Sequence, residues 1–360
     1  MNIQTLRVQN FRSYKDASFE FDPGVNIIVG PNGSGKTNLL EALLVLAQGA
    51  SYRGNDADLV SFKKPWARLD GYDQKGQRVV KIVHKVTGDN GVTKEFVIHD
   101  KPFKRLSYNY KLPITLFEPN HLRLLTGSPE LRRELLDGLL EQTEAGYGQV
   151  RRRYARTLAQ RNALLKNARH NPGELHQLFA WNVRLSDLSE QIVSHRQMLI
   201  ENINKRASKI YRQLAHNPKS KLQLFYDSNT AIEQYGSNLL KKLEEQQDLD
   251  VQRGFTGSGP HRDDIRIELN KQPASNTASR GETRSIALTL KIIELALIEA
   301  VHQQKPILLL DDVFSELDGS RRRALTEAIV GYQTFITTTD ADIVVQHFMD
   351  NCTIIPLGSS

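Results

Sequence analysis

The chain has 360 residues and a formal net charge of +7, with 39% hydrophobic and 25% charged residues. This composition is typical of folded globular proteins and excludes wholesale disorder and collagen-like repeats. The length exceeds a usual domain of about 100 to 200 residues, so two lobes or one α/β domain with an insertion are expected. A single cysteine, Cys352, excludes an intrachain disulfide and argues against a cysteine-built zinc site. No signal-peptide pattern or membrane-spanning apolar run is present, which predicts a cytoplasmic protein.

The first 120 residues predict strands separated by turns, together with one strand–loop–helix unit. Strands are expected at 6–11, 18–21, 25–29 and 112–117, and a hairpin is expected from 79–86 and 93–99 through Asp89, Asn90 and Gly91. Apolar residues at helical spacing follow the 25–29 strand and end at Gly49, which indicates a helix with a glycine at its C-terminal end.

From about 121 to 253 the chain is rich in Leu and charged residues and poor in Gly and Pro, which predicts a helical lobe with its main break at Pro172 and Gly173. Leu178, Leu185, Ile192 and Leu199 repeat every seven residues and predict a packing seam on one helix. After 254 the pattern returns to α/β, with strands expected at 264–269, 306–312 and 333–340 and helices beginning near 282 and 319.

The positive charge gathers in the helical middle of the chain. Residues 151–221 contain 15 Lys and Arg against four acidic residues. Lys205, Lys209 and Arg212 share one helical face by their spacing of four and three. Such a stripe suits DNA phosphate contacts that do not read sequence, although a solvated helix face has the same pattern. The other candidates for DNA contact are Arg151, Arg152, Arg153, Arg156, Arg161, Lys166, Arg169 and Arg206.

A complete phosphate-binding loop follows the 25–29 strand. The segment matches G-x-x-x-x-G-K followed by Ser or Thr, and it opens a helix, as the mechanism requires. Its glycines let successive backbone amides face a phosphate chain at the positive end of that helix. Lys36 is predicted to neutralise the β and γ phosphates, and the Thr37 hydroxyl to bind Mg²⁺. The predicted nucleotide-binding residues are Gly30, Pro31, Asn32, Gly33, Ser34, Gly35, Lys36, Thr37 and Asn38.

Two adjacent carboxylates, Asp311 and Asp312, end the apolar strand 306–312. Charges at the carboxyl end of a parallel strand lie beside the phosphate loop. Asp311 is therefore predicted to hold Mg²⁺, directly or through water, and Asp312 to orient or deprotonate the attacking water. Lys36, Asp311 and Asp312 are the predicted catalytic residues, and ATP and Mg²⁺ the predicted cofactors.

The segment around Ser279 admits two interpretations. Ser279 and Glu282 fit a capping box, which needs no ligand and which the residues alone favour. The same helix start, with Ser279 and Gly281, could face a phosphate supplied by a second chain.

Together these motifs resemble the ABC-type ATPases of the SMC and recombination branch, over nearly the whole chain. The segments that carry the resemblance are NFRSY, GPNGSGKTNLLEAL, PITLFEPNHLRLLTGSPELRRELLD, TGSGPHRDD, SRGE and LLLDDVFSELD. The predicted fold is an α/β P-loop ABC-type ATPase head split by an inserted, mainly helical lobe. Its parts are the N-terminal half of the head (1–120), the lobe (121–253) and the C-terminal half of the head (254–360).

The resemblance also implies a function. It implies an ATP-dependent homodimer in which Ser279 and Gly281 contact the nucleotide of the partner subunit, with Asp318 at the dimer seam. It further implies binding of single-stranded, gapped or junction DNA in repair, replication, recombination and the SOS response, and cooperation with RecR and RecO in loading RecA. Arg12 would reach the nucleotide; the alternative is a surface arginine on a strand edge.

Some residues depart from the ABC pattern. Glu282 stands where Gln is usual, the glutamine expected near Thr115 and Glu118 is missing, and threonines from Thr337 onward replace a switch histidine. A threonine there can bond a phosphate or water but cannot shuttle a proton, so slow hydrolysis is expected. The resemblance implies a slow, DNA-stimulated ATPase that acts as a dimerisation switch. An ATP-clamped interaction protein without turnover and a transporter ATPase are the alternatives.

Overall fold

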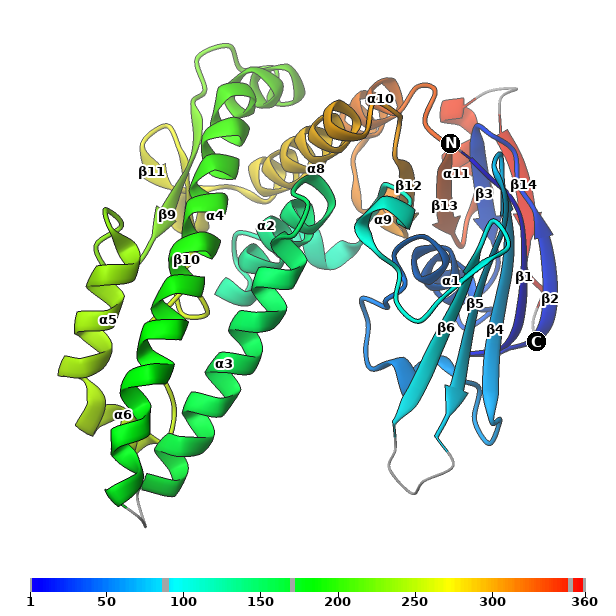
Figure 1. Cartoon of the computed structure of the whole chain (residues 1–360). Coiled ribbons are helices and arrows are strands. Elements are labelled where there is room, and N and C mark those ends of the chain that lie inside the picture. The colour runs from blue at the N-terminus through cyan, green and yellow to red at the C-terminus, as the bar shows by residue number, and fades with distance from the viewer. Residues whose placement is uncertain (1, 86–90, 169–171, 349–351, 359–360) are drawn as a thin grey trace. The chain divides into compact units, whose positions relative to one another are not determined.

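The computed structural model describes residues 2–85, 91–168, 172–348 and 352–358. The chain forms two compact units, Met1–Leu122 with Glu294–Ser360, and Arg123–Ile293. Both ends of the chain therefore belong to the first unit, where the blue N-terminal and red C-terminal strands lie together (Figure 1). This connectivity is that of a fold interrupted by an insertion.

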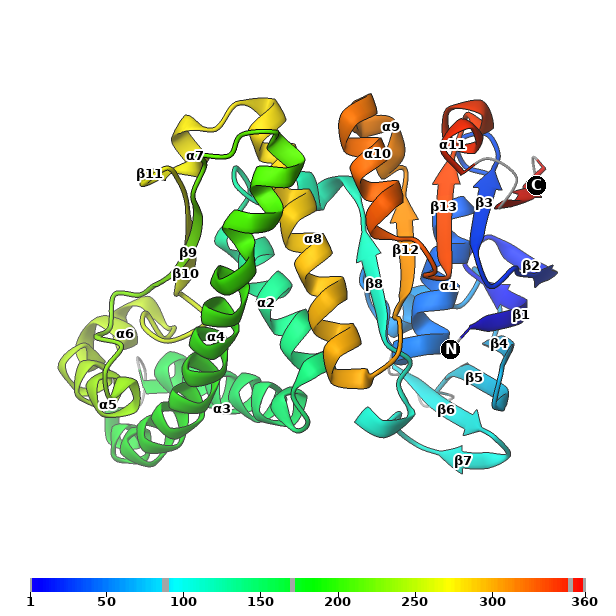
Figure 2. The same cartoon turned by 90° about the horizontal axis from the view of Figure 1, so that it is seen from above.

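A parallel sheet of order β14-β3-β13-β12-β8 carries the chemistry of the first unit. Figure 2 shows β8, β12, β13 and β3 side by side. The central strands are almost entirely buried, as expected for parallel strands covered on both faces. The bounds are β3 (Val25–Val29), β8 (Ile114–Phe117), β12 (Ile307–Asp311), β13 (Thr334–Thr338) and β14 (Cys352–Pro356). Sequence patterns predicted all of these except β14.

An antiparallel sheet of order β2-β1-β4-β5-β6-β7 completes the first unit. The predicted hairpin is confirmed, since Lys81 pairs with Glu95 across β5 and β6; the predicted turn residues Asp89 and Asn90 lie outside the described residues. The bounds are β1 (Ile3–Phe11), β2 (Tyr14–Glu20), β4 (Trp66–Asp73), β5 (Gly76–His84), β6 (Val92–Ile98) and β7 (Lys101–Phe103).

Helix α1 (Lys36–Gln48) contacts strands of both sheets. Its apolar side chains Leu39, Leu40, Leu43 and Leu46 are fully buried in the main core of this unit. Gly49 ends the helix in a left-handed conformation (φ 78°) and donates its N–H to the carbonyl of Val45, as predicted. This packing holds α1 against both sheets.

The remaining helices of the first unit are short. They are η1 (Asp56–Leu59), η2 (Tyr108–Tyr110), α9 (Val313–Glu316), α10 (Gly319–Ala328) and α11 (Ala341–Phe348), and η3 (Pro119–Arg123) runs to the start of the second unit.

The second unit is mainly helical. The predicted seam is confirmed, since Leu178, Leu185, Ile192 and Leu199 are buried along the 38-residue helix α4, which contacts α3 and α5. The helices are α2 (Pro129–Thr143), α3 (Tyr147–Ala168), η4 (Pro172–Gln177), α4 (Leu178–Ala215), α5 (Tyr235–Glu245), α6 (Gln247–Arg253), α7 (Ala274–Thr277) and α8 (Arg280–His302), which continues into the first unit.

A three-stranded sheet ties the segment after 254 to the second unit. Strand β9 (Leu222–Asp227) pairs antiparallel with β10 (Asp264–Leu269), which pairs with β11 (Gln272–Pro273). The compact second unit therefore runs to Ile293, beyond the predicted end of the lobe at 253. As functional domains, the ranges 1–120, 121–253 and 254–360 remain a prediction.

Candidate nucleotide-binding site

The phosphate loop connects β3 to α1 in the first unit. Gly33 (φ 85°) and Gly35 (φ 96°) take left-handed conformations that residues with a Cβ rarely adopt. The ammonium group of Lys36 is buried and donates to the carbonyls of Gly30 (2.8 Å) and Pro31 (3.1 Å). These two bonds provide hydrogen-bond partners for the buried ammonium group and hold it against the loop, where it can bind an anion such as a phosphate.

The two halves of the head meet at Asp311. The hydroxyl of Thr37 donates to Oδ1 of Asp311 (3.1 Å), and the hydroxyl of Thr337 donates to the same oxygen (2.7 Å). Among the described residues, none donates a hydrogen bond to Oδ2 of Asp311. The predicted metal-binding pair is thus brought together, with one carboxylate oxygen left for a cation.

Asp312 occupies the turn that follows β12. Its backbone is left-handed (φ 52°), and its N–H donates to the hydroxyl of Thr337 (2.9 Å). Partial burial raises the pKa of the Asp312 carboxyl; Lys36 opposes the rise and Asp311 adds to it. A carboxylate with a raised pKa near Lys36 suits a base that accepts a proton from water.

Arg12 contacts the phosphate-loop helix through a carboxylate. Its guanidinium donates to both oxygens of the fully buried Glu41 (2.8 and 2.7 Å) and to the carbonyl of Asp58 (2.8 Å). Arg12 therefore lies partly buried just after β1 and is paired with a carboxylate. A contact with nucleotide would have to compete with these bonds, and it remains a prediction.

The residues after Arg12 also support the loop. Ser13 accepts a hydrogen bond from Asn38 (2.9 Å), and the Tyr14 hydroxyl donates to the carbonyl of Gly35 (3.0 Å). Arg12, Ser13 and Asn38 also line an open hollow of about 840 Å³. Ser13 and Tyr14 therefore bond to residues at the start of α1. The sequence analysis did not predict this role.

Ser279 and Gly281 lie in the second unit, at the start of α8. The Ser279 hydroxyl and N–H each donate to Glu282 (2.8 Å), and the Glu282 N–H reaches the Ser279 hydroxyl (3.3 Å). The predicted capping box is confirmed. Asp318 likewise caps α10 by accepting from the N–H of Arg321 (3.0 Å).

Two other polar residues that the sequence analysis singled out, Thr115 and Arg161, are buried. Thr115 is buried within β8, where its hydroxyl has no hydrogen-bond partner among the described residues. Arg161 is fully buried and pairs with Asp250 (2.8 Å), so its candidacy for DNA contact is wrong. Charge composition alone does not distinguish a buried arginine from a solvated one.

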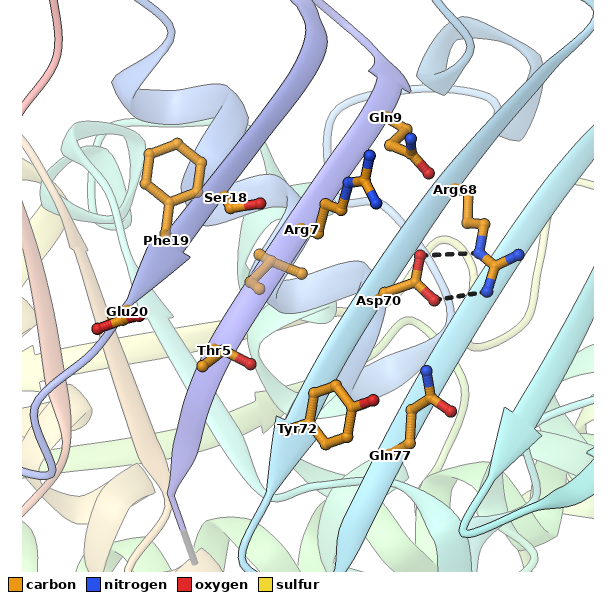
Figure 3. Close-up of a pocket in the computed structure, with 11 residues that line it drawn as sticks. Thr5, Arg7, Gln9, Ser18, Phe19, Glu20, Arg68, Asp70, Tyr72 and Gln77 are labelled. Carbon is orange, nitrogen blue, oxygen red and sulfur yellow. Dashed lines mark hydrogen bonds and ion pairs between the residues drawn. The ribbon is translucent and has the colours of Figure 1, made fainter.

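A separate hollow of about 510 Å³ lies on a face of the antiparallel sheet (Figure 3). No predicted nucleotide-binding residue lines it. Arg68 and Asp70, which point toward each other in Figure 3, form a two-bond ion pair there (2.7 Å each). Arg7, the other arginine of the lining, is paired with Asp16 (2.7 Å). Both cations are therefore matched by carboxylates, and the hollow does not offer the unopposed positive charge that a phosphate chain requires.

Comparison with known proteins decides the family. The family model "RecF/RecN/SMC N terminal domain" matches residues 2–355. The DNA replication and repair protein RecF of Heliobacterium modesticaldum is 36% identical over 347 residues, which cover 94% of this chain and 92% of the relative. The chain belongs to the RecF family. The RecF of Lactococcus lactis subsp. lactis is 35% identical over 344 residues, which cover 95% of this chain and 94% of the relative.

Solved structures agree with this family. A structure of the recombination mediator protein RecF-ATPrS has a TM-score of 0.85 and 28% identity, covering 98% of this chain and 96% of the other. The Smc head of Pyrococcus furiosus, at a TM-score of 0.51 and 17% identity, shares the fold alone. The predicted fold class, an ABC-type ATPase head with a large, mainly helical insertion, is confirmed.

The donors at Thr37 and Asp311 suit Mg²⁺, which is usually held by one or two carboxylates, phosphate oxygens and water rather than by a closed protein cage. The described residues contain no cluster of three His, Cys, Asp or Glu that could hold a metal by itself. Nor do they include a helix with the length and apolar character to cross a membrane.

Proposed function

We propose that the protein is an ATP-dependent DNA-binding protein of recombinational repair and replication-fork maintenance. The observation that carries the proposal is the convergence of Lys36, Thr37, Asp311 and Asp312 in one site of a RecF-family chain. ATP is the proposed nucleotide because two similar solved RecF structures are described with ATP or ATPrS. The cytoplasm is the proposed location.

The proposed reaction is slow hydrolysis of the β–γ bond of ATP. Lys36 would neutralise the phosphates, and Asp312 would accept a proton from the attacking water. Thr37 and Asp311 would hold Mg²⁺, which would stabilise the negative charge that develops on the phosphates. Thr337 and Thr338 at the end of β13 and Thr339 directly after it provide no group that titrates near neutral pH, which supports slow turnover. Lys36→Arg should keep part of the nucleotide binding and abolish turnover. If the wild-type protein binds ATP but never releases phosphate, with or without DNA, the alternative of a fixed ATP clamp is correct.

The proposed switch is an ATP-dependent homodimer in which Ser279 and Gly281 contact the nucleotide held by the partner subunit. Ser279 is exposed at the start of α8, and its hydroxyl would have to exchange its bond to Glu282 for a phosphate. Sedimentation of the wild-type protein with and without ATP and Mg²⁺ tests this proposal. Ser279→Arg should stay monomeric, whereas Ser275→Arg, which adds the same charge four residues earlier at an exposed position, should dimerise. A wild-type protein that stays monomeric at micromolar concentration with saturating ATP would overturn it.

The proposed DNA contact lies on the basic stripe of the second unit. Lys205, Lys209 and Arg212 are exposed along α4, and Arg152, Arg153 and Arg156 are exposed along α3. Single-stranded, gapped and duplex DNA titrated at several salt concentrations would rank the substrates. Replacing Lys205 and Lys209 together with Ala should weaken binding and lower the slope of log affinity against log salt by about 1 per lost phosphate contact. Lys241→Ala, on α5 and paired with Glu245, is the matched control.

The proposed partners are RecR and RecO, with which the protein would promote loading of RecA. The RecF structures similar to this chain are described as belonging to the RecFOR pathway, which supports this proposal. Co-sedimentation of the ATP-bound protein with RecR on gapped DNA, followed by a RecA-loading assay, tests it.

A further inference from the structure

One buried hydroxyl joins the two carboxylate residues of the site. Thr337 lies in β13 directly opposite Asp311 of β12, and its side chain is fully buried. Its hydroxyl donates to Oδ1 of Asp311 (2.7 Å) and accepts from the N–H of Asp312 (2.9 Å). A single side chain thus contacts both residues.

The order of the strands explains this position. β13 lies between β3, which leads into the phosphate loop, and β12, which ends in the two carboxylates. A threonine hydroxyl has one proton to donate. The Asp311 carboxylate is closer to it than the carbonyl of Leu310 (3.4 Å), so the proton goes to Asp311. The hydroxyl proton of Thr337 is then not available to a phosphate, although the sequence analysis allowed such a bond.

The second bond holds a strained turn. Asp312 is left-handed (φ 52°, ψ 14°), a conformation that costs energy in a residue with a Cβ and persists where its surroundings hold it. The bond from the Asp312 N–H to Thr337 anchors this turn beside Asp311. The direction of the Asp312 carboxylate depends on that anchor.

We propose that Thr337 is a positioning residue for ATP hydrolysis, which acts through Asp311 and Asp312 and does not touch the nucleotide. By occupying Oδ1 of Asp311 together with Thr37, it leaves Oδ2 as the metal ligand. By bonding to the Asp312 N–H, Thr337 also holds the turn that carries the proposed base, Asp312, against β13. The inference rests on the proposed Mg²⁺ site at Thr37 and Asp311.

The test compares Thr337→Val, which keeps the shape but removes the hydroxyl, with Thr337→Ser, which keeps the hydroxyl. ADP affinity is measured by titration with Mg²⁺ and with EDTA, and ATP turnover is measured separately. In Thr337→Val the Mg²⁺-dependent gain in ADP affinity should fall by about tenfold, as when the supporting partner of a metal ligand is lost. Turnover should fall by about 10- to 100-fold, the effect of a lost hydrogen bond to a charged group. ADP affinity in EDTA should not change, and Thr337→Ser should stay within threefold of the wild-type protein in all three quantities.

Thr334→Val is the matched control, because it removes another fully buried hydroxyl from the same strand, one bonded to the carbonyl of Tyr332. It should leave the Mg²⁺-dependent gain unchanged. Thr337→Val that keeps both the gain and the turnover would overturn the inference. So would a folded Thr337→Ser that loses them, even if Thr337→Val does not fold. A wild-type protein whose ADP affinity ignores Mg²⁺ would overturn the proposed metal site itself, a separate result.

Discussion

The hydroxyl of Thr37 donates a hydrogen bond to Oδ1 of Asp311 across 274 positions of sequence. The bond joins the first residues of α1 to the last residue of β12, so each half of the head supplies part of one site. The insertion between them can therefore vary in size while the site is kept, provided that both halves reach the same sheet.

Asp311→Asn tests this junction. The substitution removes the negative charge that should bind Mg²⁺, so the Mg²⁺-dependent gain in ADP affinity should fall by about tenfold or more. ADP affinity in EDTA should be close to that of the wild-type protein. Asp342→Asn, an exposed substitution in α11, is the control. If Asp311→Asn keeps its full response to Mg²⁺, Asp311 is not the metal ligand.

Asp312→Asn should separate binding from chemistry. The amide keeps the shape of the side chain but cannot accept a proton, so turnover should fall by about 100- to 10,000-fold, the usual contribution of a general base. ATP affinity and ATP-dependent sedimentation should persist, because neither requires proton transfer. Single-turnover phosphate release is the measurement, and a variant that hydrolyses ATP at the wild-type rate would exclude Asp312 as the base.

The parts of the site that the sequence predicts are those encoded within one segment. The phosphate loop needs only β3, its glycines and the start of α1, and the two aspartates directly follow a run of four apolar residues. Thr337 is different, because its role depends on β13 lying between β3 and β12, and that order is set by packing over long range. The sequence shows that threonines replace a switch histidine in this segment, but it does not show that the hydroxyl of Thr337 faces Asp311.

Burial was the second property that the sequence did not show. Arg12 and Arg161 both looked like candidates for phosphate contact, yet each is matched by a buried carboxylate, Glu41 and Asp250. Each carboxylate lies far from its arginine in sequence, so no local spacing rule connects them. The exposed part of the stripe on α4 was predictable because its spacing places Lys205, Lys209 and Arg212 on one helical face.

Gly35→Ala and Gly33→Ala separate two demands on the phosphate loop. Both residues have positive φ, so each alanine should lower the free energy of unfolding by about 1–2 kcal/mol. A Cβ on Gly35 would also lie 3.0 Å from the Tyr14 hydroxyl oxygen, whereas a Cβ on Gly33 would meet nothing within 4 Å. Gly35→Ala should therefore be the more destabilising variant and should weaken ADP binding more. Urea unfolding and ADP titration would check the order, and equal effects would contradict the role of Tyr14.

Arg161→Leu should affect stability and not DNA binding. Its charge is buried with Asp250 and is also bonded to Asn182 and Thr256, so its removal leaves a buried carboxylate unpaired and should cost about 3–5 kcal/mol of unfolding free energy. Arg156→Leu, at an exposed position of the same helix, should change stability by less than about 0.5 kcal/mol and should weaken DNA binding. Weaker DNA binding by folded Arg161→Leu, with Arg156→Leu unaffected, would contradict this assignment.

His261 should make the second unit sensitive to acid. Its Nε2 lies 3.2 Å from the carbonyl of Thr256, which can only accept, so in the neutral ring Nε2 donates there and Nδ1 accepts from the Tyr154 hydroxyl (2.5 Å). Burial lowers its pKa from 6.5 to about 4. As the pH falls from 6.5 to 4, the unfolded chain takes up a proton that the folded chain does not. The free energy of unfolding should therefore fall by about 3 kcal/mol over that range through this residue alone.

His261→Gln isolates this contribution, because glutamine can replace both hydrogen bonds but does not titrate. Denaturant unfolding of the wild-type protein and His261→Gln at several pH values between 7 and 4 gives the measurement. The variant should be the less stable protein at pH 7, where the packing of the imidazole is lost, and the difference should shrink or reverse toward pH 4. Since other carboxyl groups titrate alike in both proteins, their effect cancels in the comparison. Two parallel curves would show that His261 takes up its proton in the folded state as readily as in the unfolded one.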